Sequence, residues 1–526
     1  MTRITPYLLL LALCAVLFFW RLGGVPLMGM DEGVYAGCAR EMAASGNYVV
    51  PMLNGRPFFD KPPVVFWLQA ASIREFGVNS FAPRLPSAIA ALALVFLTVF
   101  LGSRLFDRHA GLLAGFAVAC TLLTVGLARM CLLDQLFALT IAASLGAFIL
   151  CHVGALPRRV YLLFWAAMGL SVMVKGPAGA ALIIITVAVF LLIRRRTGEV
   201  AKMMPIAGVL IALAIALPWY VLVQRATGGA FLGEFLIHQN IQRALGQDFH
   251  HNMPFFFYIP VFLVGFFPWS VFVPFAWTGH VRLRPKDKTG EAALFLATWM
   301  VTVIAVFSLC RSALPAYIFP SFPAAALLVG LGWSRAAESG RLGSLTRYAA
   351  VSVVFAAIIG GGSIAANSFM PRLMPGLGSA LTVMGVSLIA GTVAAYVLLR
   401  LRRQTGAFAA LCGGMAAFLL AAVGLGLPVA AKSKSAPLLA AAQCIHQTAT
   451  TKEQVLSYRL PLDEPGLLGF YAQRPIPDHK TRPELSRALA SYRRCLVIAR
   501  RADIKDLPQG GKPVAKVNQY LLYRFE

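Results

Sequence analysis

The sequence has few charged residues, and acidic residues are especially scarce. Asp, Glu, Lys and Arg make up 13% of its 526 residues, hydrophobic residues make up 59%, and the mean hydropathy is +0.73. A soluble core cannot bury that much apolar surface, so this composition excludes a soluble globular protein. The apolar residues gather in stretches of about 17 to 25, each long enough to cross a bilayer. The sequence therefore predicts a helical protein that crosses a membrane many times.

The sequence also lacks the cysteine patterns of metal and redox sites. Its nine cysteines form no CxxC motif and no cysteine–histidine cluster, which excludes a zinc knuckle and an iron–sulfur centre. Cys444 and Cys495 lie in the C-terminal tail, where an outer location would permit a disulfide, but their spacing does not establish one. No small-x-small cleavage site follows the first apolar span, so we expect that span to remain as an anchor.

Positive charge is abundant, and its placement indicates topology. The formal net charge is +26, but the basic residues separate the apolar spans and form no aromatic-basic ribbon, so we expect no nucleic-acid partner. Alternate loops carry the arginine and lysine excess, and by the positive-inside rule these loops face the cytoplasm. We predict about 13 transmembrane helices, near residues 5–22, 84–103, 111–128, 134–153, 160–174, 177–193, 205–223, 255–278, 293–310, 315–333, 348–368, 378–399 and 408–429. This odd number places the first loop and the C-terminal tail together on the periplasmic side.

Two domains are expected. A membrane domain covers residues 1–431 and includes a periplasmic loop at 23–83. The tail, residues 432–526, shows helical periodicity at 438–446 and 482–492 and strand patterns at 455–458, 495–499 and 520–523. The predicted fold class is an all-α polytopic membrane protein with a small C-terminal α/β domain. The tail has no catalytic spacing, so we expect it to stabilise the protein or to dock an acceptor.

The loop at residues 23–83 concentrates the charge that the rest of the chain lacks. It contains Asp31, Glu32, Arg40, Glu41, Arg56, Asp60 and Lys61. We expect Asp31 or Glu32 to begin a short helix with Arg40 and Glu41 facing water or a site, and nearby prolines to hold Asp60-Lys61 in a rigid turn. The structural alternative makes Asp31 a helix N-cap and Asp60-Lys61 a solvated pair. Their occurrence in one loop of a charge-poor chain favours function.

Further ionisable residues fall on the same side of the predicted membrane. They are Arg129, Asp134, Lys175, Arg243, His251 and Arg311. For Arg129 and Lys175 the alternative is snorkelling to the membrane interface. A carboxylate at the head of an apolar helix, as at Asp134, needs a partner or a wet pocket. Together these groups predict a polar cavity at the membrane surface.

These residues carry a family resemblance. The motifs are Asp31-Glu32-x-x-Tyr35, Arg40-Glu41-Met42, Phe59-Asp60-Lys61-Pro62, Leu133-Asp134, Lys175-Gly176, Ile241-Gln242-Arg243, His251-x-x-Pro254-Phe255 and Leu314-Pro315-x-Tyr317. In these motifs the chain resembles the bacterial aminoarabinose transferases that modify lipid A. Those enzymes belong with protein O-mannosyltransferases to a wider family of polyprenyl-phosphate-sugar-dependent transferases of the GT-C fold. The resemblance covers most of the membrane part in order.

The resemblance implies inverting transfer of a sugar from an undecaprenyl-phosphate carrier to a lipid acceptor, at the periplasmic face of the bacterial inner membrane. Asp31, Asp134 and Lys61 would be catalytic. Lys61 would stabilise the leaving phosphate, and Asp31 would act as general base toward a hydroxyl acceptor or orient a phosphate acceptor. Asp134 would bind sugar hydroxyls or steady basic residues. The implied substrate-binding residues are Glu32, Tyr35, Lys175, Arg243, Arg311 and Tyr317.

Cofactor and substrate stay open at this point. By resemblance, Asp60 and His251 stand where related transferases bind a divalent metal, but an Asp/His pair does not distinguish zinc from other cations, and the functional hypothesis does not depend on a metal. The chain has Val34 and Ala313 where the aminoarabinose enzymes have Arg and Lys, and Asp60 where they have Glu. Donor sugar and acceptor are therefore undecided, and a protein O-glycosyltransferase is an alternative. A lipid-linked sugar flippase would be expected to place its ionisable residues at mid-membrane.

Overall fold

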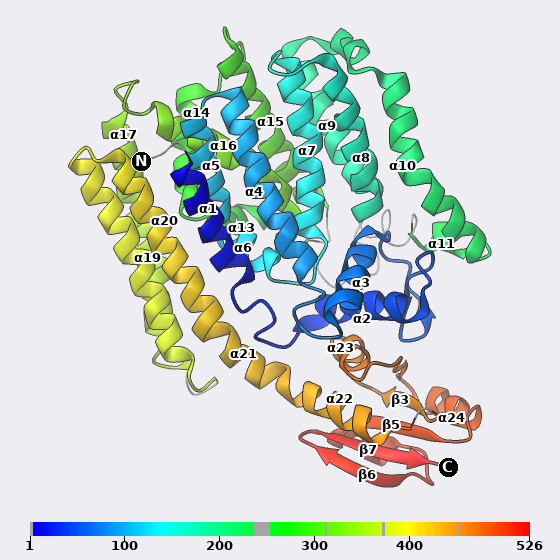
Figure 1. The fold of residues 1–526 in the computed structure, drawn as a ribbon. Coiled ribbons are helices and arrows are strands. Elements are labelled where there is room, and N and C mark those ends of the chain that lie inside the picture. The colour runs from blue at the N-terminus through cyan, green and yellow to red at the C-terminus, as the bar shows by residue number, and fades with distance from the viewer. Residues whose placement is uncertain (1–3, 236–252, 311–312, 371–373, 451) are drawn as a thin grey trace.

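The computed structural model describes residues 4–235, 253–310, 313–370, 374–450 and 452–526. It is a helical bundle with a small α/β domain beside one end (Figure 1). The loop between the first two spans folds as helices α2 and α3 at that same end. We call this the loop end of the bundle and the other the opposite end.

Apolar helices of differing length build the membrane part. They are α1 (Thr5–Cys14), α4 (Leu85–Leu105), α5 (Arg108–Ala119), α6 (Leu122–Ala128), α7 (Asp134–His152), α8 (Tyr161–Lys175), α9 (Pro177–Arg194), α10 (Pro205–Ala226), α13 (Tyr258–Gly265), α14 (Val273–His280), α15 (Lys288–Leu309), α16 (Phe322–Arg335), α17 (Leu342–Ala366), α19 (Leu377–Arg400), α20 (Gln404–Ala421) and α21 (Leu427–Lys434). Short 3-10 or π segments extend or join them: η1 (Ala15–Phe19), η2 (Arg158–Val160), η3 (Thr197–Met203), η5 (Trp269–Phe272), η6 (Pro315–Ser321) and η7 (Ala422–Gly426). A three-residue helix, α11 (Ala230–Leu232), follows α10.

Each predicted span falls on a helix or on a bent pair of helices. Within the described ranges, nine helices are long and apolar enough to cross a membrane, and eleven candidate spans result if each bent pair is one span. The pair at 108–128 bends by 65° and the pair at 258–280 by 105°, so the straight helices predicted there are wrong in shape. The other two predicted spans coincide with the shorter helices Thr5–Phe19 and Tyr161–Lys175. The predicted polytopic all-α architecture is confirmed.

Burial separates inner helices from outer ones. The segment Pro315–Arg335 is 89% buried, whereas α10, α17 and α19 are each only 22% buried. Their exposed side chains are large and apolar, for example Ile206 at 81% and Ile358 at 67%. Such surfaces are stable against lipid chains and would be unfavourable in water. The outer helices therefore face the bilayer, and the inner ones form the packed core.

The first loop folds into regular elements. Helix α2 (Gly29–Ser45) carries two acidic residues in its first turn, where they favour the positive end of the helix dipole, and ends at Gly46 with φ +71°. Strands β1 (Met52–Leu53) and β2 (Arg56–Pro57) form a hairpin whose Asn54-Gly55 turn has positive φ at both residues, as that dipeptide favours. Helix α3 (Val64–Phe76) then leads to α4.

The C-terminal domain is a five-stranded sheet with helices. Its strands are β3 (Gln454–Tyr458), β4 (Asp478–His479), β5 (Cys495–Arg500), β6 (Lys512–Val517) and β7 (Tyr520–Phe525), in the order β4-β3-β5-β7-β6, and its helices are α22 (Ala436–Thr448), α23 (Glu464–Tyr471) and α24 (Arg482–Ala490), with the 3-10 turn η8 (Arg501–Asp506). Strand β3 runs parallel to β4 and β5, and β7 runs antiparallel to β5 and β6. All five predicted elements are present, while α23, β4 and β6 were missed. All nine cysteines are free, so Cys444 and Cys495 are not bonded.

Helix α23 docks this domain onto the first loop. The backbones approach so closely that a Cβ added at Gly33 would lie 2.8 Å from the backbone nitrogen of Leu467. The Tyr471 hydroxyl accepts a hydrogen bond from the Leu27 N–H at 2.7 Å and lies 2.8 Å from the Ser80 hydroxyl. The first loop and the tail therefore lie at the same end of the bundle, as the odd number of spans predicted (Figure 1). Helix α23 thus packs the tail against the charged loop.

Candidate functional site

An ion pair at the loop end joins two membrane helices. Asp134 is the first residue of α7 and Lys175 the last residue of α8, and the Lys175 Nζ lies 2.8 Å from the Asp134 Oδ1. Each charge also suits its helix end, because helix N-termini favour anions and C-termini favour cations. Both side chains are 12% exposed. The partner that Asp134 was expected to need is thus Lys175.

Two aromatic rings contact the Lys175 ammonium. Its Nζ lies 4.5 Å from the centre of the Tyr317 ring and 4.9 Å from that of Phe137. Cation–π contact of this kind stabilises a partly desolvated ammonium. The snorkelling alternative for Lys175 does not describe this side chain, which is held between a carboxylate and two rings. Asp134, Lys175 and Tyr317, which we call the cluster, come from three separate elements, α7, α8 and η6.

Tyr35 connects the cluster to the first loop. It is buried in α2, with its ring 5.7 Å from that of Phe66. Burial raises the pKa of the Tyr35 phenol well above its usual value, and the neighbouring Asp31, Asp134, Tyr317 and Asp60 raise it further. Charged and polar groups of the first loop, α7 and η6 are therefore close enough to Tyr35 to act on its pKa. Tyr35 stays protonated at neutral pH and can donate its hydrogen to a substrate oxygen.

Asp31, Asp60 and Lys61 lie in the first loop with differing exposure. Asp31 is exposed in the first turn of α2, whose N-cap residue is Met28, so the interpretation of Asp31 as the N-cap is wrong. Asp60 and Lys61 are half-buried in the turn before α3, where Pro62 and Pro63 are buried. The Lys61 ammonium donates to the Asp60 carbonyl oxygen at 2.9 Å. The turn is constrained as predicted.

Glu32 differs sharply from its neighbour Asp31. It is 1% exposed, and its two oxygens accept from the Arg84 guanidinium, each at 2.8 Å. The same oxygens accept from the Cys131 and Met28 N–H groups, each at 2.8 Å. These bonds engage the Glu32 carboxylate within the protein, and its predicted contact with substrate stays a prediction. Sequence reasoning missed Arg84, whose only signal was a cation at the head of an apolar helix.

The expectations for Arg40, Glu41 and Arg129 are corrected by the structure. Arg40 and Glu41 were expected to face water or the site, but both are buried and lie 3.2 Å apart. The Glu41 carboxylate accepts from the Asn54 and Gly55 N–H groups and so holds the hairpin turn. Arg129 does not snorkel, because its guanidinium donates to four carbonyl oxygens of residues 17–21 at the end of the first span. These charges hold the loop end together.

Three predicted site residues, Arg243, His251 and Arg311, lie outside the described residues. Their contribution stays a prediction. Within the described part of the chain, no three His, Cys, Asp or Glu side chains gather to hold a metal ion. Because His251 was one of the two candidate ligands, the divalent metal at Asp60 and His251 also stays a prediction.

Comparison with known proteins gives consistent matches. Residues 60–221 match the dolichyl-phosphate-mannose-protein mannosyltransferase family. The chain is 31% identical over 441 residues to the undecaprenyl phosphate-alpha-4-amino-4-deoxy-L-arabinose arabinosyl transferase of Pectobacterium carotovorum, covering 81% of this chain and 77% of that protein. It is 32% identical to the transferase of the same name from Aeromonas salmonicida, over 58% of this chain. That alignment spans 55%, or about half, of the Aeromonas protein.

A solved structure shares the fold over nearly the full length. The crystal structure of ArnT from Cupriavidus metallidurans bound to undecaprenyl phosphate matches with a TM-score of 0.81 and 24% identity. The match covers 99% of this chain and 98% of that one. This likeness confirms the predicted GT-C fold, including the C-terminal domain.

Proposed function

The chain belongs to the family of undecaprenyl phosphate-aminoarabinose arabinosyl transferases, and from this membership we propose that it transfers a pentose from an undecaprenyl-phosphate carrier to a lipid acceptor. The reaction would take place at the periplasmic face of the bacterial inner membrane. The names of the relatives supply the donor class. The observation that carries the proposal is the placement of Asp31, Tyr35, Asp60 and the cluster together at one membrane surface.

The proposed chemistry is an inverting displacement. The acceptor oxygen attacks the anomeric carbon from the face opposite the phosphate, and the bond between that carbon and the phosphate oxygen breaks. The bonding electrons leave with undecaprenyl phosphate, so negative charge grows on its oxygens. A fixed cation beside these phosphate oxygens lowers the activation barrier, because it interacts most strongly with the charge of the transition state. We assign this role to Lys61.

The remaining residues have complementary roles in this proposal. Asp31 accepts the proton of a hydroxyl acceptor, or orients an acceptor that is already an ionised phosphate. Tyr35, held protonated by its surroundings, donates a hydrogen bond to the sugar or the acceptor. The Lys175 charge is already paired with Asp134. In this proposal that pair and Tyr317 orient the sugar, and Lys61 binds the leaving phosphate.

The direct test is sugar transfer by the purified full chain. The enzyme is incubated with labelled undecaprenyl-phosphate aminoarabinose and either lipid A or a serine- and threonine-rich peptide as acceptor. We expect the label to move to the lipid. Transfer to the peptide would favour the protein O-glycosyltransferase, which the family match at residues 60–221 supports. Transfer to neither, with movement of the carrier across vesicles, would favour a flippase.

Substitution of Lys61 tests the assignment of the phosphate-binding cation. Lys61→Ala should depress turnover strongly at saturating donor, and Lys61→Arg should restore part of it because arginine keeps the charge with a different geometry. An ion pair without a catalytic role would contribute about 0 to 1 kcal/mol to stability and have little kinetic effect. Normal turnover of the alanine variant would transfer the role to Arg243 or Arg311.

Cysteine labelling in spheroplasts tests the proposed orientation. Cysteines placed at Glu75 in the first loop and Gln509 in the tail should react with an impermeant maleimide, because both positions are exposed at the loop end. A cysteine at Glu338, which is exposed at the opposite end, should be protected until the membrane is opened. The reverse pattern would reject the periplasmic assignment.

A further inference from the structure

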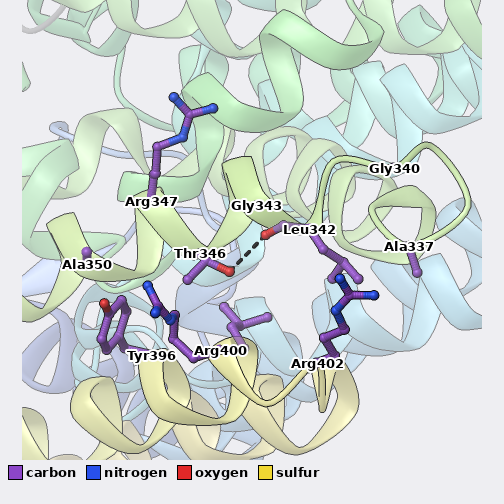
Figure 2. Close-up of a pocket in the computed structure, with 11 residues that line it drawn as sticks. Ala337, Gly340, Leu342, Gly343, Thr346, Arg347, Ala350, Tyr396, Arg400 and Arg402 are labelled. Atoms are coloured by element: carbon purple, nitrogen blue, oxygen red, sulfur yellow. Dashed lines mark hydrogen bonds between the residues drawn. The ribbon is translucent and has the colours of Figure 1, made fainter.

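A basic cavity lies at the opposite end of the bundle, remote from the cluster. Its volume is about 610 Å³, and it lies between the start of α17, the end of α19 and the connection from α16 to α17. Its polar lining consists of Thr346, Arg347, Tyr396, Arg400 and Arg402 (Figure 2). Arg400 and Arg402 extend from the end of α19 toward the start of α17.

The cavity has positive charge without acidic partners. Arg347, Arg400 and Arg402 are exposed, and none of them forms an ion pair with a described residue. The neighbouring Arg335 differs, because it pairs with Asp107 and Glu338. The Arg400 and Arg402 side chains extend into the space between the two helices, whereas the Arg347 side chain extends away from them (Figure 2). Two unpaired guanidinium groups at one cavity favour an anionic ligand, and the planar guanidinium matches the oxygens of a phosphate group.

Exposed apolar faces run along both helices that border the cavity. On α17, Arg347 shares a helix face with Val351, Val354 and Ile358, which are 44%, 58% and 67% exposed. On α19, Arg400 shares a face with Val386, Val393 and Val397, which are 52%, 40% and 46% exposed. Each arginine thus ends a lipid-facing apolar stripe. A cation at the end of an apolar surface matches a phospholipid, whose phosphate group lies at one end of its acyl chains.

We propose that this cavity binds the phosphate headgroup of an anionic phospholipid, with the acyl chains along α17 and α19. Basic pockets between transmembrane helices at the cytoplasmic side recognise such headgroups. Arg400 and Arg402 bind the phosphate, and Tyr396 stands beside Arg400 as a further hydrogen-bond donor (Figure 2). The apolar stripes distinguish a lipid from a soluble phosphate. The proposal is independent of the transfer reaction, since none of its residues belongs to the cluster or the first loop.

Lipid titration of the purified full chain in a neutral detergent tests this site. Binding of phosphatidylglycerol, phosphatidylcholine and inorganic phosphate is measured by native mass spectrometry. The pocket variant Arg400→Gln with Arg402→Gln is compared with a control that also loses two charges, Arg159→Gln with Arg195→Gln. Arg159 and Arg195 are exposed at the same end, form no ion pair with a described residue and lie outside the cavity.

We expect the wild type and the control to bind phosphatidylglycerol more tightly than phosphatidylcholine. Loss of two basic residues near a membrane surface should weaken binding in the pocket variant roughly 30-fold. Equal phosphatidylglycerol affinity in the pocket variant and the control would overturn the proposal. Saturation by inorganic phosphate that displaces the lipid equally would also overturn it, because the site would then recognise phosphate alone. If the double variant does not fold, the single variant Arg402→Gln, at a residue that follows the end of α19, should still show weaker phosphatidylglycerol binding.

Discussion

The two ends of helix α7 each carry a cluster of charges, and the two clusters differ in balance. Its first residue, Asp134, pairs with Lys175 near Tyr35 and the carboxylates of the first loop. Its last residue, His152, contacts Glu199 and Glu291, each at 3.0 Å, and Glu291 also pairs with Arg194 at 3.0 Å. At the His152 end, acidic and basic groups face one another directly. At the Asp134 end, the carboxylates of Asp31, Asp60 and Asp134 act on one buried phenol, that of Tyr35, and raise its pKa.

The difference shows what separates a site from a structural ion cluster. Burial does not separate them, because the Glu291 side chain is 10% exposed and that of Asp134 is 12% exposed. Pairing does not separate them either, since both groups have partners. The loop end differs in that three acidic residues, Asp31, Asp60 and Asp134, raise the pKa of the buried Tyr35 phenol beside the Asp134–Lys175 pair. Ionisable groups that perturb one another in this way are typical of functional sites.

The largest effect is expected from Asp31→Asn, which removes one carboxylate of the loop end. A general-base or orienting role supplies about 10²- to 10⁴-fold in rate, so transfer by the variant should fall by that factor. Stability should hardly change, because Asp31 is exposed. The measurement is turnover at saturating donor, with the melting temperature recorded in parallel. Turnover within a few fold of the wild type would remove Asp31 from the site.

A second substitution, at the adjacent residue, should act on stability. Glu32→Gln leaves Arg84 buried without a compensating charge, and breaking a buried pair in this way costs about 3–5 kcal/mol. We expect a markedly lower melting temperature, with residual transfer proportional to the amount of folded protein. An unchanged melting temperature together with lost turnover would return Glu32 to the substrate-binding residues.

The smallest effect is expected from a surface pair at the opposite end. Arg335→Gln removes contacts to Asp107 and Glu338 from a side chain that is 40% exposed. Exposed ion pairs typically contribute about 0.2–1 kcal/mol, so both melting temperature and transfer should stay close to the wild type. A loss of transfer in this variant would show that the opposite end also takes part in the reaction.

Much of the architecture could be predicted from the sequence because its signals are local. Apolar runs, the Asn54-Gly55 turn and the continuous apolar strand at 495–499 are all patterns of a few neighbouring residues. The bends at 120–121 and 266–268 were missed even though Thr121 caps the following helix and Pro268 cannot continue one. Strand β6 was missed because its exposed, lysine-containing pattern lacks the alternation of a half-buried strand.

The candidate site was predictable only in part, because its partners are distant in sequence. The loop motif pointed to Asp31, Tyr35 and Lys61, but local pattern could not tell that Glu32 is bonded to Arg84, 52 residues away. The same limit applies to Asp134 and Lys175, which are 41 residues apart. Each of these charges alone is equally consistent with a helix end at the membrane surface. Which carboxylates bond to other residues of the protein depends on how the helices pack, and a local sequence pattern does not contain that information.

The most direct test of the central claim compares one substitution at each end of α7. Asp134→Asn and Glu291→Gln each remove one carboxylate charge, and the two side chains are similarly buried, at 12% and 10% exposed. Turnover at saturating donor is measured per folded protein. If the loop end is the transfer site, Asp134→Asn should lose about 100-fold or more in turnover. Glu291→Gln should stay within a few fold of the wild type. Equal turnover in the two variants would contradict the assignment of the reaction to the loop end.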